Sequence, residues 1–264
     1  MPHVPGVVER INGERLVLLG WPCAILMQVA HPLIAAGVEE HSTFRDSPVA
    51  PLRRLHGTIK AMLGLTFGDA REQQRVIDTI RAIHTRVNGT LDREVGRYPA
   101  GIPYSAEDPA LLLWVHATLI DTSIRLYELL VGSLTAADRD EYCRDSASVA
   151  LALGADPTAV PRDWSAMSNY VEAILASHTL AVGSHALSLA DAILNSRTMT
   201  LSGPAGWTTR RLTAGLLPPE LRRQYGLQWD TRQERRFLHI VSSLKRIRSW
   251  TPARLARWKG SRSA

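Results

Sequence analysis

The sequence contains few of the residues that common structural frameworks require. Its 264 residues include only two cysteines, Cys23 and Cys143, which lie far apart in the chain. This number and spacing exclude a disulfide framework and a cysteine zinc site, and they favour a reducing compartment. The first residues also lack the pattern of a secretory signal, because Glu9 and Arg10 stand where its apolar core would continue. We therefore expect a cytoplasmic protein.

Signature motifs of several enzyme classes are missing as well. The chain has no glycine-rich phosphate loop, no strand–helix alternation, no internal repeat and no G-x-S-x-G elbow. The zinc-peptidase spacing His-Glu-x-x-His does not occur, and neither Glu128 nor Glu172 is followed three positions later by the histidine of a di-iron bundle. No nucleic-acid-binding motif occurs either, so we expect no nucleic-acid partner.

An uninterrupted membrane-spanning segment is also absent from the sequence. The longest apolar stretch, Leu16 to Val38, is long enough to cross a bilayer. It is interrupted, however, by polar and helix-breaking residues, namely Gly20, Pro22, Gln28, His31 and Pro32. We interpret the stretch as a buried helix from Pro22 to Gly37, which Pro32 kinks by removing one backbone donor.

What the sequence does contain is helical periodicity over nearly its whole length. Hydrophobic residues make up 45% of the chain, which is enough for a full core, and many recur at three- and four-residue spacing. We predict helices over residues 7–15, 22–37, 51–67, 69–87, 108–132, 133–153, 164–176, 184–195, 209–216, 219–225 and 230–250. Segment 88–104, rich in glycine and proline, is the predicted long loop. The pattern predicts a single all-α domain over residues 1–264.

The stretch from Asp108 to Gly132 is the most apolar of these helices. Ser105 fits an N-cap, Pro109 suits the first turn and Gly132 suits a C-terminal stop. A helix that is apolar on all sides is normally buried, and one ionisable ring, His116, lies in its middle. Burying a histidine without a partner is costly, so His116 is either a hydrogen-bonded core residue, which is the commoner case, or a metal ligand.

Three polar clusters lie on or beside other apolar helices: Gln28 with His31, Glu39-Glu40-His41, and Arg54 with Thr58. Haem fits a single histidine on an apolar helix, because the porphyrin supplies four nitrogens and the protein needs only one ligand. Haem also needs an apolar slot and cations for its propionates. The candidate cations are Arg53, Arg54, Arg81 and Arg86.

Three segments of the chain resemble a known family. They are QVAHPLIAAGVEEHSTFRDSP, PLRRLHGTIKAMLGLTFG and LLLWVHATLIDTSIRLYELLVG. In this order they resemble the bacterial rubber oxygenases, also called latex clearing proteins, and the fungal MpaB-type oxygenases, over roughly residues 20–195. The chain is most similar to the short bacterial members. The resemblance implies an all-α, globin-like multi-helix bundle that holds haem b and uses dioxygen.

The resemblance also implies roles for individual residues. His116 matches the histidine that is the proximal ligand of the iron, and Arg54 and Thr58 match residues near the haem. The acidic base of the family falls at Glu39 or Glu40, and Glu40 is the better match. We expect catalytic roles for Glu40, Arg54 and Thr58, and cofactor contacts from His116, Arg54, Thr58, His31 and Gln28.

One position departs from the family pattern. Rubber oxygenases carry a lysine just before the matching threonine, which can cap the distal iron face, but this chain has Gly57 there. We expect a more open distal face, unless another residue fills it; the second ligands considered are His31, His41 and His56. Alternatively, Gly57 only permits close helix packing. The larger rubber-binding parts are also missing, so we expect a small apolar substrate instead of a polymer.

The sequence therefore predicts a haem b-dependent oxygenase that performs oxidative C=C cleavage, hydroxylation or dehydrogenation. The alternative is a non-enzymatic helical protein that binds a lipid-like ligand or an anionic membrane surface. This alternative is based on charge, because residues 232–264 carry ten Lys or Arg and one acidic residue. We expect the basic C-terminal tail, residues 251–264, to contact a membrane peripherally at most and to be dispensable for folding.

Overall fold

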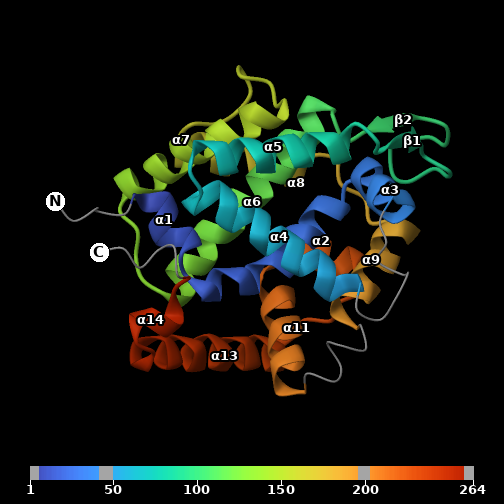
Figure 1. Cartoon of the computed structure of the whole chain (residues 1–264). Coiled ribbons are helices and arrows are strands. Elements are labelled where there is room, and N and C mark those ends of the chain that lie inside the picture. The colour runs from blue at the N-terminus through green and yellow to red at the C-terminus, as the bar shows by residue number, and fades with distance from the viewer. Residues whose placement is uncertain (1–5, 42–49, 196–202, 259–264) are drawn as a thin grey trace.

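The computed structural model describes residues 6–41, 50–195 and 203–258, which form an all-α multi-helix fold (Figure 1). The predicted all-α class is thereby confirmed. In chain order the elements are α1 (Val7–Asn12), η1 (Arg15–Gly20), α2 (Trp21–Val29), α3 (Pro32–His41), α4 (Ala50–Phe67), α5 (Ala70–His84), β1 (Asn88–Thr90), β2 (Pro103–Ser105), α6 (Pro109–Leu130), α7 (Ala136–Leu153), α8 (Trp164–Ala176), α9 (Ser184–Leu194), α11 (Pro204–Leu216), α12 (Pro219–Gln224), α13 (Thr231–Trp250) and α14 (Ala253–Ala256).

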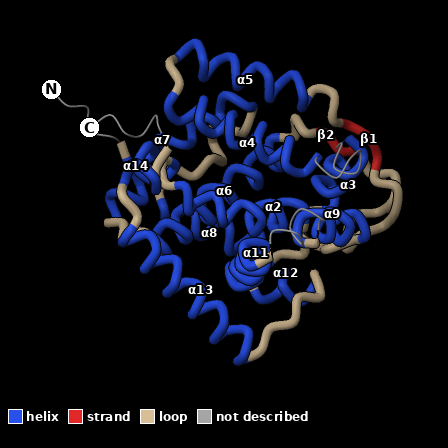
Figure 2. The backbone as a smooth tube through the Cα atoms, turned by 60° about the horizontal axis from the view of Figure 1, so that its bottom comes forward, coloured by secondary structure: helices blue, strands red, loops and turns tan. Residues whose placement is uncertain are grey.

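Helix α6 lies in the middle of the molecule, with α5 and α13 on opposite sides of it (Figures 1 and 2). Its N-cap is Asp108 and not Ser105 as predicted, because the Asp108 carboxylate accepts the backbone N–H of Ala110 at 2.8 Å. Pro109 occupies the first turn as predicted. Trp114 is 2% exposed and donates its indole N–H to the Met27 carbonyl of α2 at 3.1 Å. Helix α6 packs against η1, α2, α7 and α8, so it is the core helix.

The apolar stretch 16–38 forms separate short helices instead of the one kinked helix that we predicted. Helix α2 ends at Val29, and α3 begins at Pro32 and leaves the preceding axis at 109°. Pro32 lacks the N–H that a continuing helix needs, and it suits the first turn of the next helix. The bend lets α2 pack on α6 while α3 packs on α9. Among the described helices none alone has the length and apolarity to cross a membrane, although this bent pair meets those two criteria together.

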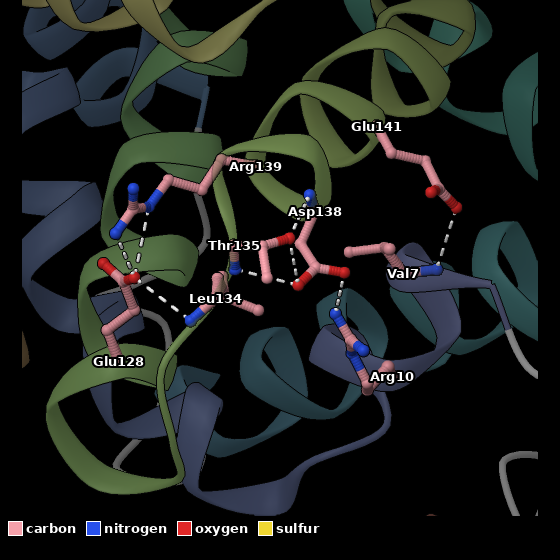
Figure 3. Close-up of polar contacts among 8 residues, drawn as sticks. All are labelled: Val7, Arg10, Glu128, Leu134, Thr135, Asp138, Arg139 and Glu141. Atoms are coloured by element: carbon pink, nitrogen blue, oxygen red, sulfur yellow. Dashed lines mark hydrogen bonds and ion pairs between the residues drawn. The ribbon is translucent and has the colours of Figure 1, made fainter.

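Polar contacts at its first turn hold α7 against α1 and α6 (Figure 3). Thr135 and Asp138 form a capping box, in which the Thr135 hydroxyl accepts the Asp138 N–H at 3.0 Å. The Asp138 carboxylate also accepts a hydrogen bond from Arg10 of α1. Arg139 donates to Glu128 of α6 at 2.5 Å. These contacts position α7 so that its second half lines the cavity described below.

The C-terminal segment is docked at residues 256–258, whereas residues 252–255 are exposed as predicted for the tail. Glu14 is 4% exposed, and Arg248 of α13 donates to both of its oxygens at 2.8 Å. The Arg257 guanidinium lies 3.8 Å from the same carboxylate. The backbone N–H of Trp258 donates to the Gly13 carbonyl at 3.0 Å. A buried carboxylate needs such partners. Residues 259–264 lie outside the described part of the chain.

The segment predicted as a long loop contains a small antiparallel hairpin. Strand β1 pairs with β2 so that Gly89 lies opposite Tyr104. Gly101 has a φ of 85°, a backbone conformation that favours glycine, and its N–H donates to the Leu91 carbonyl at 2.7 Å. The hairpin packs on α3. It therefore brings Tyr104 beside the C-terminal end of that helix.

Candidate functional site

A cavity of about 330 Å³ lies among α3, α5, α6, α7 and the hairpin. Most of its walls are aliphatic side chains such as Leu33, Ile34, Val115 and Leu119. Its lining also includes six polar side chains: Gln28, His41, His84, Tyr104, Ser105 and His116. Its volume is at the lower end of the roughly 300–1,000 Å³ of small-molecule sites, and such sites combine apolar walls with a few polar groups. The cavity is therefore suited to an apolar ligand.

His116 projects from the core helix into the lining of this cavity. Its side chain is 8% exposed, and its Nε2 is buried without a hydrogen-bond partner. Burial lowers the pKa of His116 to about 4, so the ring is neutral near pH 7. A hydrogen-bonded core histidine would have its ring nitrogens satisfied. An unpartnered, neutral imidazole on an apolar cavity is instead the form in which histidine binds a metal.

Glu40 belongs to a hydrogen-bonded group at the edge of the cavity. The Tyr104 hydroxyl donates to Glu40 and lies 3.3 Å from His41 Nε2, which in turn lies 3.1 Å from the Asn88 carbonyl. Burial, and secondly the hydrogen bond to Glu40, raises the pKa of the Tyr104 phenol, so Tyr104 remains a proton donor to the carboxylate. Glu40 itself is exposed at the surface. Tyr104 thus joins a solvent-exposed carboxylate to the cavity wall.

Gly89 is required for this arrangement. A Cβ atom at Gly89 would lie 2.6 Å from the Tyr104 hydroxyl and 3.1 Å from the Glu40 carboxylate. Both distances are below ordinary van der Waals contact, so the backbone approaches the two side chains as closely as only glycine permits.

The neighbouring carboxylate of Glu39 has a different environment. The Ser188 hydroxyl of α9 donates to Glu39 at 3.2 Å, which links α3 to α9. Glu39 therefore contributes to helix packing. Of the two acidic residues, Glu40 is the one whose carboxylate is connected to the cavity lining through Tyr104.

Gln28 and His31, which we predicted as one cluster, lie in different surroundings. Gln28 lines the cavity and donates to the Thr118 hydroxyl of α6 at 3.0 Å. His31 is buried, and its Nε2 lies 3.1 Å from the Tyr98 hydroxyl. Burial, with a smaller effect of Arg97, lowers the pKa of His31 to about 4. Gln28 is thus among the cavity-lining residues and His31 is not.

The predicted residues of α4 are not brought to the cavity in the described part of the chain. His56, Gly57 and Thr58 are exposed and do not contribute to its lining. The side chain of Arg54 lies outside the described residues. A Cβ atom at Gly57 would have nothing within 4 Å, so this glycine does not serve close helix packing. The roles of Arg54 and Thr58 stay predictions.

His84 is a cavity residue that the sequence analysis missed. It is the last residue of α5, it lines the cavity, and its Nδ1 is buried without a hydrogen-bond partner. Burial lowers the pKa of the His84 ring, with Glu107 opposing that effect. The sequence does contain a signal that could have identified it. His84 lies four residues after Ile80 and three before Val87, which places it on the apolar stripe of that helix.

The comparisons with known proteins agree with the resemblance noted in the sequence. The model of the family described as ER-bound oxygenase mpaB/B'/Rubber oxygenase, catalytic domain, matches residues 9–246. Two uncharacterized proteins, one from Mycobacterium bovis and one from Mycobacterium tuberculosis, are each 26% identical over 231 residues, covering 84% of both chains. No solved structure matches the chain, so the globin-like character of the bundle stays a prediction. Because the family model covers most of the sequence, the chain belongs to the mpaB and rubber oxygenase family, and membership of this oxygenase family implies the use of dioxygen.

Proposed function

We propose that this protein is a haem b-dependent oxygenase in which His116 is the proximal iron ligand and the substrate is a small apolar molecule. The observation that carries the proposal is the buried, unpartnered Nε2 of His116 on an apolar cavity. The family supports oxygenase chemistry. The haem itself is inferred from the donor set, because one neutral imidazole within aliphatic walls is what a porphyrin iron requires.

The residues present fit haem in chemistry and in surroundings. His116 provides a neutral nitrogen from the most rigidly packed helix, which suits a permanent ligand. The aliphatic walls suit the porphyrin faces. Helix α5 has no fully buried residue, so a displacement of this wall would disturb few packed side chains. Arg81 and Arg86 are exposed on and just beyond α5, where cations for the propionates were predicted.

Bound haem b would supply the redox-active iron that activates dioxygen. The protein's side chains would bind and orient the substrate. The aliphatic lining holds an apolar molecule and excludes water from it. Tyr104 lines the cavity and donates to Glu40, so a proton taken up by the Tyr104 hydroxyl from the substrate side is matched by the one that this hydroxyl gives to the Glu40 carboxylate. Because Glu40 is exposed, the proton passes on to solvent.

The size of the cavity supports a small substrate. A volume of about 330 Å³ is at the lower end of small-molecule sites and does not suit a long polymer. The proposed reaction on this substrate is oxidative C=C cleavage, as in the family. Hydroxylation and dehydrogenation are the other two candidate reactions, because they need the same apolar pocket and proton acceptor.

A haem titration of the protein and two histidine variants tests the proposal. Wild type and the exposed control His178→Ala should bind one haem per chain with the same Soret band, and His116→Ala should lose this band while staying helical by circular dichroism. Equal haem binding by all three proteins would contradict the role of His116. Failure of wild type to bind haem, together with uptake of a fatty-acid probe, would instead support the non-enzymatic lipid-binding alternative.

A further inference from the structure

Two of the histidines that line the cavity have a buried nitrogen without a hydrogen-bond partner. They are His116 on α6, at Nε2, and His84 on α5, at Nδ1. The third histidine of the lining, His41, differs because its Nε2 lies within hydrogen-bond distance of the Asn88 carbonyl and the Tyr104 hydroxyl. Buried polar atoms are rarely left unpaired, and each exception calls for an explanation. A shared ligand in the cavity would explain both unpaired atoms at once.

Haem has room for two such nitrogens. Its iron is held by four porphyrin nitrogens and has two axial positions, one on each face. The two histidines come from different helices, α6 and α5, and both line the same cavity. A group that inserts between these helices would have an imidazole available from each.

We propose that His84 is the second protein ligand of the haem iron and occupies the axial position that external ligands must take. This proposal depends on the haem function proposed above, and it assigns to His84 a position that the sequence left to an open site or to another histidine. His31 also has a buried unpartnered nitrogen, Nδ1, but it is not among the residues that line the cavity. His41 is engaged with Asn88, and His56 is exposed on α4 outside the lining.

The two ligands would differ in strength because their helices are held differently. Helix α6 buries His116 among core residues, whereas α5 has no fully buried residue and ends at His84. Moving the end of α5 therefore disturbs few packed side chains. His116 is the permanent ligand, and His84 is the displaceable one. An external ligand then binds only to the fraction of molecules in which His84 has left the iron, which lowers its apparent affinity.

The spin state of the ferric protein tests this assignment without an activity assay. Wild type should show a low-spin, six-coordinate spectrum by absorption and electron paramagnetic resonance. His84→Ala should become high-spin, bind imidazole about tenfold more tightly or better, and return to the low-spin spectrum once imidazole is bound. His41→Ala is the matched control, because its ring lines the same cavity but has hydrogen-bond partners, and it should keep the wild-type spectrum.

Three outcomes would overturn the assignment of His84. They are a high-spin, five-coordinate wild type, a His84→Ala spectrum identical to wild type, or a spin change caused by His41→Ala in place of His84→Ala. In each of these cases the protein still binds haem, so the proposed function stands. If neither wild type nor His84→Ala binds haem, the proposed function fails and the His84 assignment fails with it.

Discussion

Helices α5 and α6 contribute to the same cavity, but they are embedded in the protein very differently. Helix α6 contains 15 buried residues among its 22, and it packs against six other helical elements, namely α1, η1, α2, α7, α8 and α13. Helix α5 contains none among its 15, and its stripe of Val76, Ile80 and Ile83 remains partly or fully exposed. The site therefore has one wall held in the core, which carries His116 and is called the fixed wall below, and one lightly packed wall, α5, called the adjustable wall.

The largest expected effect on stability comes from truncating a buried side chain of the fixed wall. Trp114→Ala removes a 2%-exposed indole and its hydrogen bond to Met27, so the free energy of unfolding should fall by about 3–5 kcal/mol. Ile83→Ala on α5 is the comparison, because Ile83 is 50% exposed, and its cost should stay within about 0.5–1 kcal/mol. Urea denaturation of both variants measures the difference. Equal losses would show that the two walls are packed alike.

The docked C-terminal segment is expected to have the next largest effect. Ending the chain after Trp250 removes the Arg257 contact with Glu14 and the backbone hydrogen bond from Trp258 to Gly13. It also removes the cation–π contact between Arg15 and Trp258, in which the Arg15 guanidinium lies 4.7 Å from the centroid of the Trp258 ring. The summed loss should be roughly 2–3 kcal/mol, seen as a lower melting temperature.

The control for this truncation is a chain that ends after Trp258, which should melt like wild type. Equal melting temperatures for the two truncated chains and wild type would restore the prediction that the whole tail is dispensable.

A smaller loss is expected at the hairpin that joins the two walls. Gly89→Ala places a methyl group 2.6 Å from the Tyr104 hydroxyl, which must shift away from Glu40. The cost should be roughly 1–2 kcal/mol, because the side-chain end of Tyr104 can give way. Gly132→Ala is the control, since a Cβ there has nothing within 4 Å. Thermal melts compare them, and a neutral Gly89→Ala would mean that the approach to Tyr104 is looser than described.

The smallest expected effect lies on α4, which packs against α5. Gly57→Lys introduces a better helix former at an exposed position with no atom within 4 Å of the new Cβ. The variant should fold and be more stable by roughly 0.5–1 kcal/mol. Chemical denaturation would show it. A clear loss of stability would mean that Gly57 packs closely against another helix after all.

The core wall could be predicted from the sequence, because burial follows local hydrophobic pattern. The nearly continuous apolar residues of the 108–132 stretch predicted a buried helix around His116, and α6 is that helix. Its cap was misplaced from Asp108 to Ser105, since both are residue types that accept backbone N–H groups. Pro32 predicted a disturbance, but its size, a 109° bend, depends on how α2 and α3 pack on other helices.

The rest of the site depends on contacts between residues distant in sequence, which no local pattern reveals. Tyr104 reaches Glu40 only because a hairpin forms where a loop was predicted. His84 looked like one more residue of an amphipathic helix until its position on the cavity was known. The contact of the tail with the rest of the protein was not predictable, because the carboxylate that binds Arg248 and Arg257 comes from Glu14, near the other end of the chain.

The central claim is that the fixed wall holds a haem through His116, and the absorption spectrum of the purified protein tests it most directly. Oxidised and dithionite-reduced spectra of wild type, with a pyridine haemochrome to identify the macrocycle, should show a Soret band and the signature of haem b. The same preparation of His116→Ala should lack that band. A wild-type protein that shows no Soret absorption after incubation with haem, or a His116→Ala variant with the wild-type spectrum, would contradict the account.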